Sequence, residues 1–410
     1  MTPLLWMGLV GGSLGAGAAL ATLLVIKRRL ESLAMAAGIA SMMVSVVSGS
    51  RLVALYERPE LTLIATLIAV SSVGGGFALI SSLLPYLRPK PPDPNVASPG
   101  ASPGILVVIL VDVESESYAP GEVTREIEEL VDAGLPEPTL SVAPFHYAAQ
   151  KARFRAVGDR SPEPARAREL AERVESRLDP EIFSGLTLVR CADEGSLTAT
   201  LRAASSAGFP RAVVVGAYVA ESYRAARERG AADSLFEGTD TIAVTYTPPL
   251  WTSDDLARLI SRQVLAIRLD SARTGVALVV HGQPGEHERL NESFDIQENA
   301  FANRIRMFLD EEGIDGDFVR VCTAEWREPG VTETVRHLAA LGCDRVLVMP
   351  ACHPFANLQT LLDMPAAARD ARVPDEVRVV HLPPWGDDDT FADVLVRAIG
   401  EAVAQQTRKS

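Results

Sequence analysis

Two stretches of this sequence repeat each other at a constant distance of 134 residues. Leu197-Thr198 recurs as Val331-Thr332, and Trp251 recurs as Trp385. Chance matches between apolar residues do not keep one offset across a helix, a strand, a second helix and the segment that follows. The repeat therefore predicts that the chain contains a duplicated structural unit, and it limits the fold to one that can be built twice.

Short runs rich in β-branched residues alternate with helical patterns from Ile105 onward. They lie at 105–111, 186–189, 211–215, 241–245, 275–280, 318–321, 345–349 and 377–380. Apolar runs separated by helices are typical of parallel strands that are buried on both faces. We therefore predict an α/β fold with two duplicated open parallel-sheet lobes of Rossmann-like type, at 105–268 and 269–405, which bind ligands at the carboxyl ends of their strands.

The amino-terminal 88 residues are strongly apolar and predict about three transmembrane helices, near 4–26, 32–49 and 61–87. A helix of about 20 apolar residues spans the hydrocarbon core of a bilayer. The charges Lys27-Arg28-Arg29 follow the first run, whereas a signal peptide carries its charge before the apolar segment. Basic residues also follow the third run, at Arg88 and Lys90, and basic clusters stay in the cytoplasm. We predict a multi-pass protein of the cytoplasmic membrane whose remaining part, after residue 88, lies in the cytoplasm and is joined through a proline-rich linker at 89–104.

Charge and cysteine usage narrow the set of partners. Of the 39 basic and 53 acidic residues, seven basic and four acidic ones fall in the first 104 positions, so the remainder carries a net charge of about −17. Such a field repels nucleic acid. The four cysteines show no CxxC spacing, which favours ordinary core thiols over a disulfide framework or a metal cluster. Neither GxGxxG nor GxxxxGK[ST] occurs, so we expect no nucleotide partner.

Two predicted strands of the second lobe end in histidine-containing turns. His281 follows the strand 275–280, and His353 follows the strand 345–349, which we place beside it. Gln359 and Asp363 are four residues apart on the next helix and share one of its faces. Imidazole with carboxylate at adjacent strand ends is the composition of a divalent-metal or proton-transfer site.

The second lobe carries a set of motifs that resembles the ferrochelatase family, which inserts ferrous iron into a porphyrin. His281-Gly282-Gln283-Pro284 looks like the family's HGLP motif, which holds its catalytic histidine. The other matching residues are Phe294 and Gln297 (GDPYPxQ), Trp326, Pro329 and Thr332 (WLxPxT), Gly342 with 345–348 and Pro350 (GxxRVLVxP), Thr360-Leu361 (ETL), Gly158, Ser161 and Pro162 (IGGxSP), and Tyr218 with Ser222 (PLYPxYS). In order and spacing these motifs cover nearly all of 105–405.

The resemblance implies a membrane-tethered metal chelatase of haem biosynthesis. It makes His281 the base or metal contact, and we add His353 as a candidate for a second metal ligand. Porphyrin contacts are implied at Tyr218, Ser222, Phe294 and Trp326. Ferrous iron would be a substrate, and we expect no tightly bound cofactor and no iron–sulfur cluster, because no cysteine follows Cys352.

One departure bears directly on the chemistry. The family's acidic residue in the ETL motif is Gln359 here, and an amide cannot accept a pyrrole proton. We hypothesise that Asp363 supplies the lost carboxylate. Two alternatives stay open, namely a catalytically decayed domain that binds porphyrin or haem without turnover, and a chelatase of the sirohydrochlorin or cobalt kind.

Overall fold

The fold is described from a computed structural model, which covers residues 2–27, 30–56, 59–87, 104–132, 134–136, 138–139, 142–236, 242–267, 273–288 and 291–407. The proline-rich linker expected at 89–104 lies outside this part except for Gly104. The chain divides into two compact units, one comprising Met1–Lys90 with Ser117–Arg160 and the other Pro91–Glu116 with Ser161–Ser410. The first unit thus takes in Ser117–Arg160, a segment expected in the first lobe.

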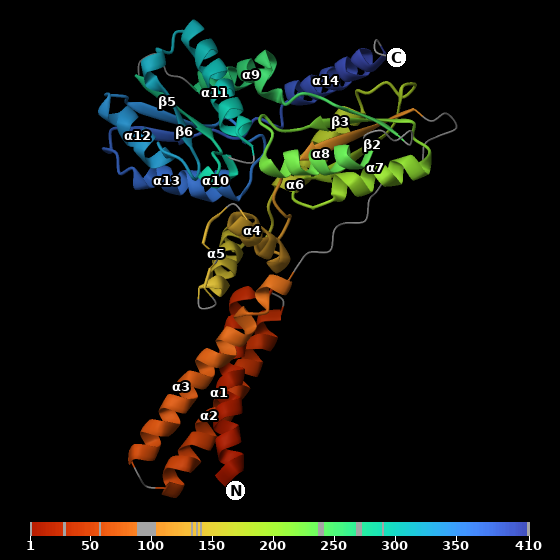
Figure 1. The fold of residues 1–410 in the computed structure, drawn as a ribbon. Coiled ribbons are helices and arrows are strands. Elements are labelled where there is room, and N and C mark those ends of the chain that lie inside the picture. The colour runs from red at the N-terminus through yellow and green to blue at the C-terminus, as the bar shows by residue number, and fades with distance from the viewer. Residues whose placement is uncertain are drawn as a thin grey trace. The chain divides into compact units, whose positions relative to one another are not determined.

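The first unit contains three long apolar helices, α1 (Thr2–Val25), α2 (Glu31–Tyr56) and α3 (Pro59–Ser81) (Figure 1). By length and composition all three are candidate membrane spans, the third counted on to Tyr86 through the short helix η2 (Leu84–Tyr86), and their mean hydropathies are 1.7, 1.7 and 2.1. α1 lies against α3 at very short range, since a Cβ atom on Gly17 would sit 1.9 Å from the Val73 carbonyl oxygen, and it also approaches α2, where a Cβ atom on Gly12 would sit 2.6 Å from the Ser41 carbonyl oxygen. Small residues allow such close backbone approach between apolar helices.

A hairpin of two further helices, α4 (Pro120–Asp132) and α5 (Ala143–Ala156), completes the first unit. The Lys151 amine of α5 reaches the Leu23 carbonyl oxygen at 2.5 Å and that of Ile26 at 3.3 Å, and it forms an ion pair with Glu31 at 2.9 Å. The last carbonyl groups of a helix have no partner within it and favour a cation. Lys151 therefore caps the end of α1, and Tyr118 adds a hydrogen bond to the Val25 carbonyl oxygen.

The second unit holds two four-stranded parallel sheets of the same topology. The first contains β1 (Ile105–Val111), β2 (Phe183–Arg190), β3 (Arg211–Gly216) and β4 (Ala243–Tyr246) in the order β2-β1-β3-β4. The second contains β5 (Thr274–Val280), β6 (Val319–Thr323), β7 (Arg345–Pro350) and β8 (Arg378–His381) in the order β6-β5-β7-β8. The predicted fold class of two parallel α/β lobes is confirmed, and the identical strand orders fit a duplication.

Helices cover both faces of each sheet (Figure 1). The first lobe's sequence contributes α6 (Glu163–Glu175), α7 (Ser196–Ala207), α8 (Tyr223–Phe236), η3 (Leu250–Thr252) and α9 (Asp254–Ile267). The second contributes α10 (Gly285–Glu288), α11 (Ser293–Glu311), η4 (Gly316–Phe318), α12 (Val331–Ala340), η5 (Gln359–Asp363), α13 (Met364–Asp370) and α14 (Asp389–Thr407). The last helix of each lobe packs on the other lobe: α9 lies against α11, and α14 lies against α6, β3 and β4. The central strands β1 and β5 are buried along their whole length.

Side-chain alternation along the central strands divides the core. Leu106 and Val108 pack against α7 and α8, whereas Val107 and Ile109 face a cluster that also contains Val276, Leu278 and residues of α6, α9, α11 and α14. Successive side chains of a strand point to opposite faces of the sheet. The inner faces of the two lobes therefore share one hydrophobic core, which fixes the strand ends of both lobes within one body.

Candidate active site

His281 stands directly after β5, at the carboxyl end of a fully buried strand. The chain turns at Gly282, whose φ is +74° and where a Cβ atom would lie 2.5 Å from the Glu325 carbonyl oxygen. Only glycine fits a positive φ and so close an approach without strain. The turn takes the backbone away from the strand and leaves the His281 side chain 39% exposed.

The imidazole of His281 is held by a buried carboxylate, that of Glu298 on α11. Glu298 is 1% exposed, and its Oε1 accepts hydrogen bonds from the His281 backbone N–H (3.1 Å) and from Nδ1 (3.0 Å). Its Oε2 accepts from the Gly282 N–H at 3.0 Å. Because a carboxylate only accepts, Nδ1 carries the proton and Nε2 is the ring nitrogen left with a lone pair. Among the described residues no group hydrogen-bonds to Nε2.

Glu298 was not among the residues predicted from the sequence. It lies on the helix face that also carries Phe294, Phe301 and Ile305, all buried. A carboxylate on the apolar face of an amphipathic helix is the signal that could have identified it, since buried charges are retained where they have partners.

The second imidazole, His353, follows β7 and is stacked on the first. The two ring centroids are 3.6 Å apart with an angle of 29° between the planes. His353 is 1% exposed, and its Nε2–H donates to Oε1 of Gln359 at 2.6 Å. Its Nδ1 is buried and has no hydrogen-bond partner in the described part of the chain. Paired strands β5 and β7 thus bring His281, His353 and Gln359 together, as their sequence positions predicted.

The two imidazoles differ in proton affinity. Burial acts to lower the pKa of His281, but the hydrogen bond and charge of Glu298 outweigh it, with Asp112 and Glu325 adding to the effect, and the pKa is raised. Burial, together with the charge of His281, lowers the pKa of His353 well below its ordinary value. As the pH falls, His281 is therefore protonated before His353, and the stacked His353 ring stays neutral.

Acidic groups surround the pair. Asp112, which follows β1 as His281 follows β5, brings the first lobe into the electrostatic environment of His281. Burial and the neighbouring Glu298 carboxylate raise the pKa of the Cys352 thiol well above its ordinary value, so Cys352 is a protonated thiol. All four cysteines are buried and unpaired, as the sequence predicted. Across the described residues, no three His, Cys, Asp or Glu side chains are grouped to hold a metal ion.

The other predicted site residues have varied environments. Asp363 is partly buried and ends the π-helical turn η5, which begins at Gln359. Ser222 accepts a hydrogen bond from the Ala225 N–H at the start of α8, a helix-capping contact. Phe294 is buried on α11, and Trp326 is 49% exposed with a φ of +70°.

Tyr218 lies against Gly216 at the end of β3, where a Cβ atom on the glycine would sit 2.4 Å from the tyrosine ring. Burial raises the pKa of Tyr218 well above its ordinary value. The roles assigned to Tyr218, Ser222, Phe294, Trp326 and Asp363 stay predictions.

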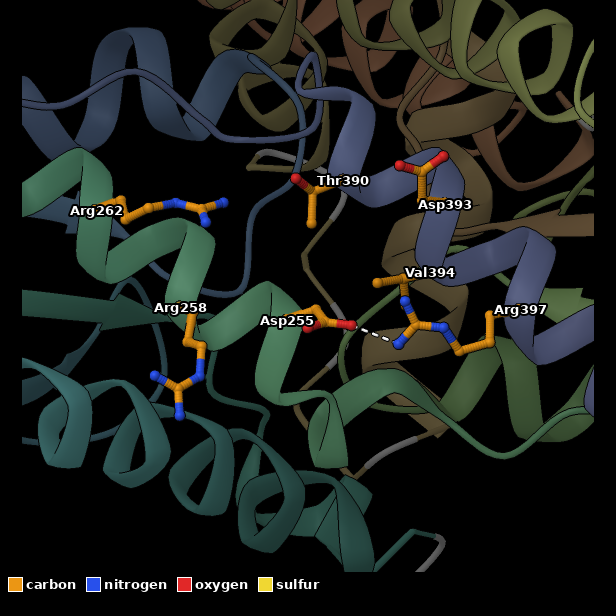
Figure 2. Close-up of a pocket in the computed structure, with 7 residues that line it drawn as sticks. All are labelled: Asp255, Arg258, Arg262, Thr390, Asp393, Val394 and Arg397. Carbon is orange, nitrogen blue, oxygen red and sulfur yellow. Dashed lines mark hydrogen bonds and ion pairs between the residues drawn. The ribbon is translucent and has the colours of Figure 1, made fainter.

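A pocket elsewhere in the second unit lies between α9 and α14 (Figure 2). Its lining includes three arginines, Arg258, Arg262 and Arg397, and Arg397 forms an ion pair with Asp255 at 2.5 Å. Arg258 stacks over the Phe308 ring at 3.9 Å. None of its lining residues belongs to the histidine site.

This chain is similar to several known proteins. The Ferrochelatase family model matches residues 131–403. A curated relative, the sirohydrochlorin cobaltochelatase of Sulfurisphaera tokodaii, is 26% identical over 134 residues, which are 33% of this chain and 98% of the relative.

Solved structures similar to this chain include SirB from Bacillus subtilis with Fe3+ (10% identity, 74% of this chain and 97% of that one, TM-score 0.48). They also include the sirohydrochlorin chelatase SirB from Bacillus subtilis subspecies spizizenii in complex with cobalt (10% identity, 73% of this chain and 96% of that one, TM-score 0.43). A third is CbiX, the terminal enzyme for biosynthesis of siroheme in denitrifying bacteria (15% identity, 73% of this chain and 99% of that one, TM-score 0.41). Because the family model covers about two thirds of the sequence, the chain belongs to the ferrochelatase family.

Proposed function

We propose that the second unit is a metal chelatase that inserts ferrous iron into a porphyrin, with His281 as the base. The observation that carries the proposal is the pairing of His281 Nδ1 with the buried Glu298, which directs the free lone pair to Nε2 on a partly exposed ring. As the metal bonds to the ring nitrogens, the pyrrole N–H bonds break and protons leave. His281 Nε2 takes one of them, and Glu298 stabilises the resulting imidazolium.

The charges near His281 favour a divalent cation. Asp112 and Glu325 raise the pKa of His281, and the same carboxylates lower the free energy of a metal ion that approaches the ring. They also favour a porphyrin over sirohydrochlorin, because sirohydrochlorin carries many more carboxylates and would be repelled more strongly. Asp363, about one helical turn beyond Gln359, is the candidate acceptor for the second proton, and His353 is a candidate metal ligand.

We further propose that α1, α2 and α3 span a membrane and hold the chelatase at its surface. Porphyrins dissolve sparingly in water and partition into bilayers, so a membrane-bound enzyme meets a higher local concentration of substrate. The support is the length and hydropathy of the three helices. The cytoplasmic position of the second unit follows from the basic residues that flank the helices.

A second candidate function is insertion of cobalt or iron into sirohydrochlorin. It is favoured by the likeness to the Sulfurisphaera tokodaii cobaltochelatase, nearly the whole length of which aligns. The third candidate, a binding domain without turnover, is favoured by Gln359, since an amide replaces the family's carboxylate.

The experiment separates these candidates with the full chain in detergent micelles. Ferrous iron and protoporphyrin or coproporphyrin are mixed with the protein under anaerobic conditions, and loss of porphyrin fluorescence is followed. A parallel reaction contains cobalt and sirohydrochlorin and is followed by absorbance. Catalytic insertion into the porphyrin supports the proposal. Turnover of sirohydrochlorin alone assigns the second function, and tight porphyrin binding without turnover assigns the third.

A further inference from the structure

Two carboxyl groups of the first lobe hold a helical turn of the second lobe. Glu114 follows β1 by three residues, and Glu163 begins α6. Glu163 is 5% exposed, and its Oε2 accepts a hydrogen bond at 2.8 Å from the backbone N–H of Glu114. The two glutamates therefore form one rigid element beside the carboxyl end of β1.

This element caps the helix that begins after Asn357. Oε1 of Glu114 accepts the Leu358 N–H at 2.9 Å, and Oε1 of Glu163 accepts from the Asn357 side-chain amide at 3.1 Å. The Asn357 side chain in turn accepts the Thr360 N–H at 2.9 Å. The first N–H groups of a helix need such acceptors, and a carboxylate there also interacts favourably with the helix dipole.

The capped turn leads directly to the imidazole pair. Gln359, the residue after Leu358, accepts the Nε2–H of His353, and His353 stacks on His281. A short chain of contacts thus runs from Glu163 through Asn357 and Gln359 to the rings. Displacing the start of the helix would move the Gln359 acceptor away from a hydrogen bond of 2.6 Å.

The need to hold the two lobes together does not by itself explain why the Glu163 carboxyl group is buried. The lobes are already joined on the surface, where Arg177, just after the end of α6, pairs with Asp389 at 2.8 Å and with Asp393 at 3.0 Å. Burying Glu163 is costly by comparison: burial and the nearby charge of Glu114 raise its pKa well above the ordinary value. An apolar contact would hold the lobes at lower cost. A buried carboxyl with two directional contacts instead specifies one geometry.

We propose that Glu114 and Glu163 are positioning residues that fix the Gln359–His353 hydrogen bond from the opposite lobe. This inference rests on the proposed function for its catalytic meaning, but the geometry it concerns can be measured without turnover. The first lobe would then set the arrangement of the imidazole pair in addition to supplying Asp112 to its surroundings.

The test follows the Nε2–H proton of His353 by 1H–15N NMR of the full chain in detergent micelles. The resonance is assigned by its loss in His353→Phe. We expect a strongly downfield signal in the wild type, because the hydrogen bond is short, and an upfield shift or exchange broadening in Glu163→Ala. Glu163→Gln keeps one oxygen acceptor and should shift the signal less than Glu163→Ala. Glu169→Ala, at an exposed position of the same helix, should leave the signal unchanged.

Asn357→Ala provides a second variant that removes the same contact from the other lobe. It should shift the signal at least as far as Glu163→Ala does, because it also removes the acceptor of the Thr360 N–H. The double variant should give the same shift as Asn357→Ala alone, since both substitutions break one chain of contacts. If Glu163→Ala does not fold, Asn357→Ala still decides the question. A wild-type His353 signal in a folded Glu163→Ala or Asn357→Ala variant would overturn the proposal, whether or not the protein turns over porphyrin.

Discussion

The imidazole rings of His281 and His353 are stacked with their centroids 3.6 Å apart, although one side chain is 39% exposed and the other residue is 1% exposed. They follow adjacent parallel strands, so the sheet itself sets their separation. Glu298 orients the exposed ring and Gln359 orients the buried one. The ring of His281 is therefore the more accessible of the two, and the ring of His353 is a neutral partner stacked against it.

Replacing Glu298 with glutamine should shift the pH dependence of turnover. The neutral form of His281 is the active base, and the Glu298 charge raises its pKa. Glu298→Gln lowers that pKa, so the acidic limb of the kcat/KM profile should move to lower pH. The maximal rate should fall by roughly tenfold or more, because the imidazolium loses its counter-charge. Asp310→Asn, exposed on the same helix, serves as the control. An acidic limb at the wild-type pH would argue against the pairing.

His353→Phe should change how stability depends on pH. The folded pKa of His353 lies well below its unfolded value near 6.5, so below about pH 6.5 the unfolded state binds the extra proton. As the pH falls below about 6.5, the free energy of unfolding should therefore decrease by about 1.4 kcal/mol for each pH unit, until the pH reaches the folded pKa of His353. Urea unfolding between pH 5 and 6.5 should show this slope in the wild type and a smaller one in His353→Phe. The exposed His337→Phe should keep the wild-type slope.

His281 changes the free energy of unfolding in the opposite direction, and it does so over a higher pH range. Its folded pKa is raised, so it adds stability that is fully present below about pH 6.5 and is lost as the pH rises through the folded value. The two rings together therefore predict a stability maximum near pH 6.5. A maximum that stays in place when either ring is replaced would contradict both assignments.

Asp363→Asn tests the carboxylate that we assign to the second proton. If this acid replaces the one missing at Gln359, the rate should fall at least roughly tenfold, which corresponds to about 1.4 kcal/mol in the barrier. Single-turnover porphyrin metalation measures the effect. Asp370→Asn, exposed near the end of α13, is the matched control. An unchanged rate for Asp363→Asn removes this residue from the mechanism.

Lys151→Met should destabilise the first unit. The substitution leaves the Leu23 and Ile26 carbonyl groups without their cap and the Glu31 carboxylate without a buried partner. Loss of charged hydrogen bonds of this kind costs about 2 kcal/mol. Thermal unfolding in micelles measures the change. Arg155→Met is the comparison, because Arg155 pairs with the same Glu31 but is 41% exposed, and it should cost less. Equal effects of the two variants would contradict a capping role for Lys151.

The sequence predicted the framework of the second unit well. All eight expected strands are present, because buried parallel strands form continuous apolar runs that stand out between helices. The expected start at Ile105 and end at Val111 match β1, whereas the run expected at 186–189 extends to Phe183–Arg190 in β2. Strand ends depend on neighbouring strands, which a local pattern does not contain.

Long-range contacts explain what the sequence did not predict. The hairpin of α4 and α5 was expected in the first lobe, but Lys151 and Tyr118 join it to the end of α1, more than 90 positions away in the chain. Glu298 was not predicted as a site residue because its partner, His281, lies on another element of the fold. The neighbourhood of His281 and His353 could be predicted, since the order of strands decides it, but the stacking of the rings depends on packing.

The central claim is that His281 is the base for metal insertion, and the most direct measurement compares single-turnover porphyrin metalation by the wild type, His281→Ala and His337→Ala. We predict that His281→Ala loses at least about a hundredfold in rate while it still binds porphyrin, and that His337→Ala matches the wild type. A His281→Ala variant that metalates porphyrin at the wild-type rate would contradict the account.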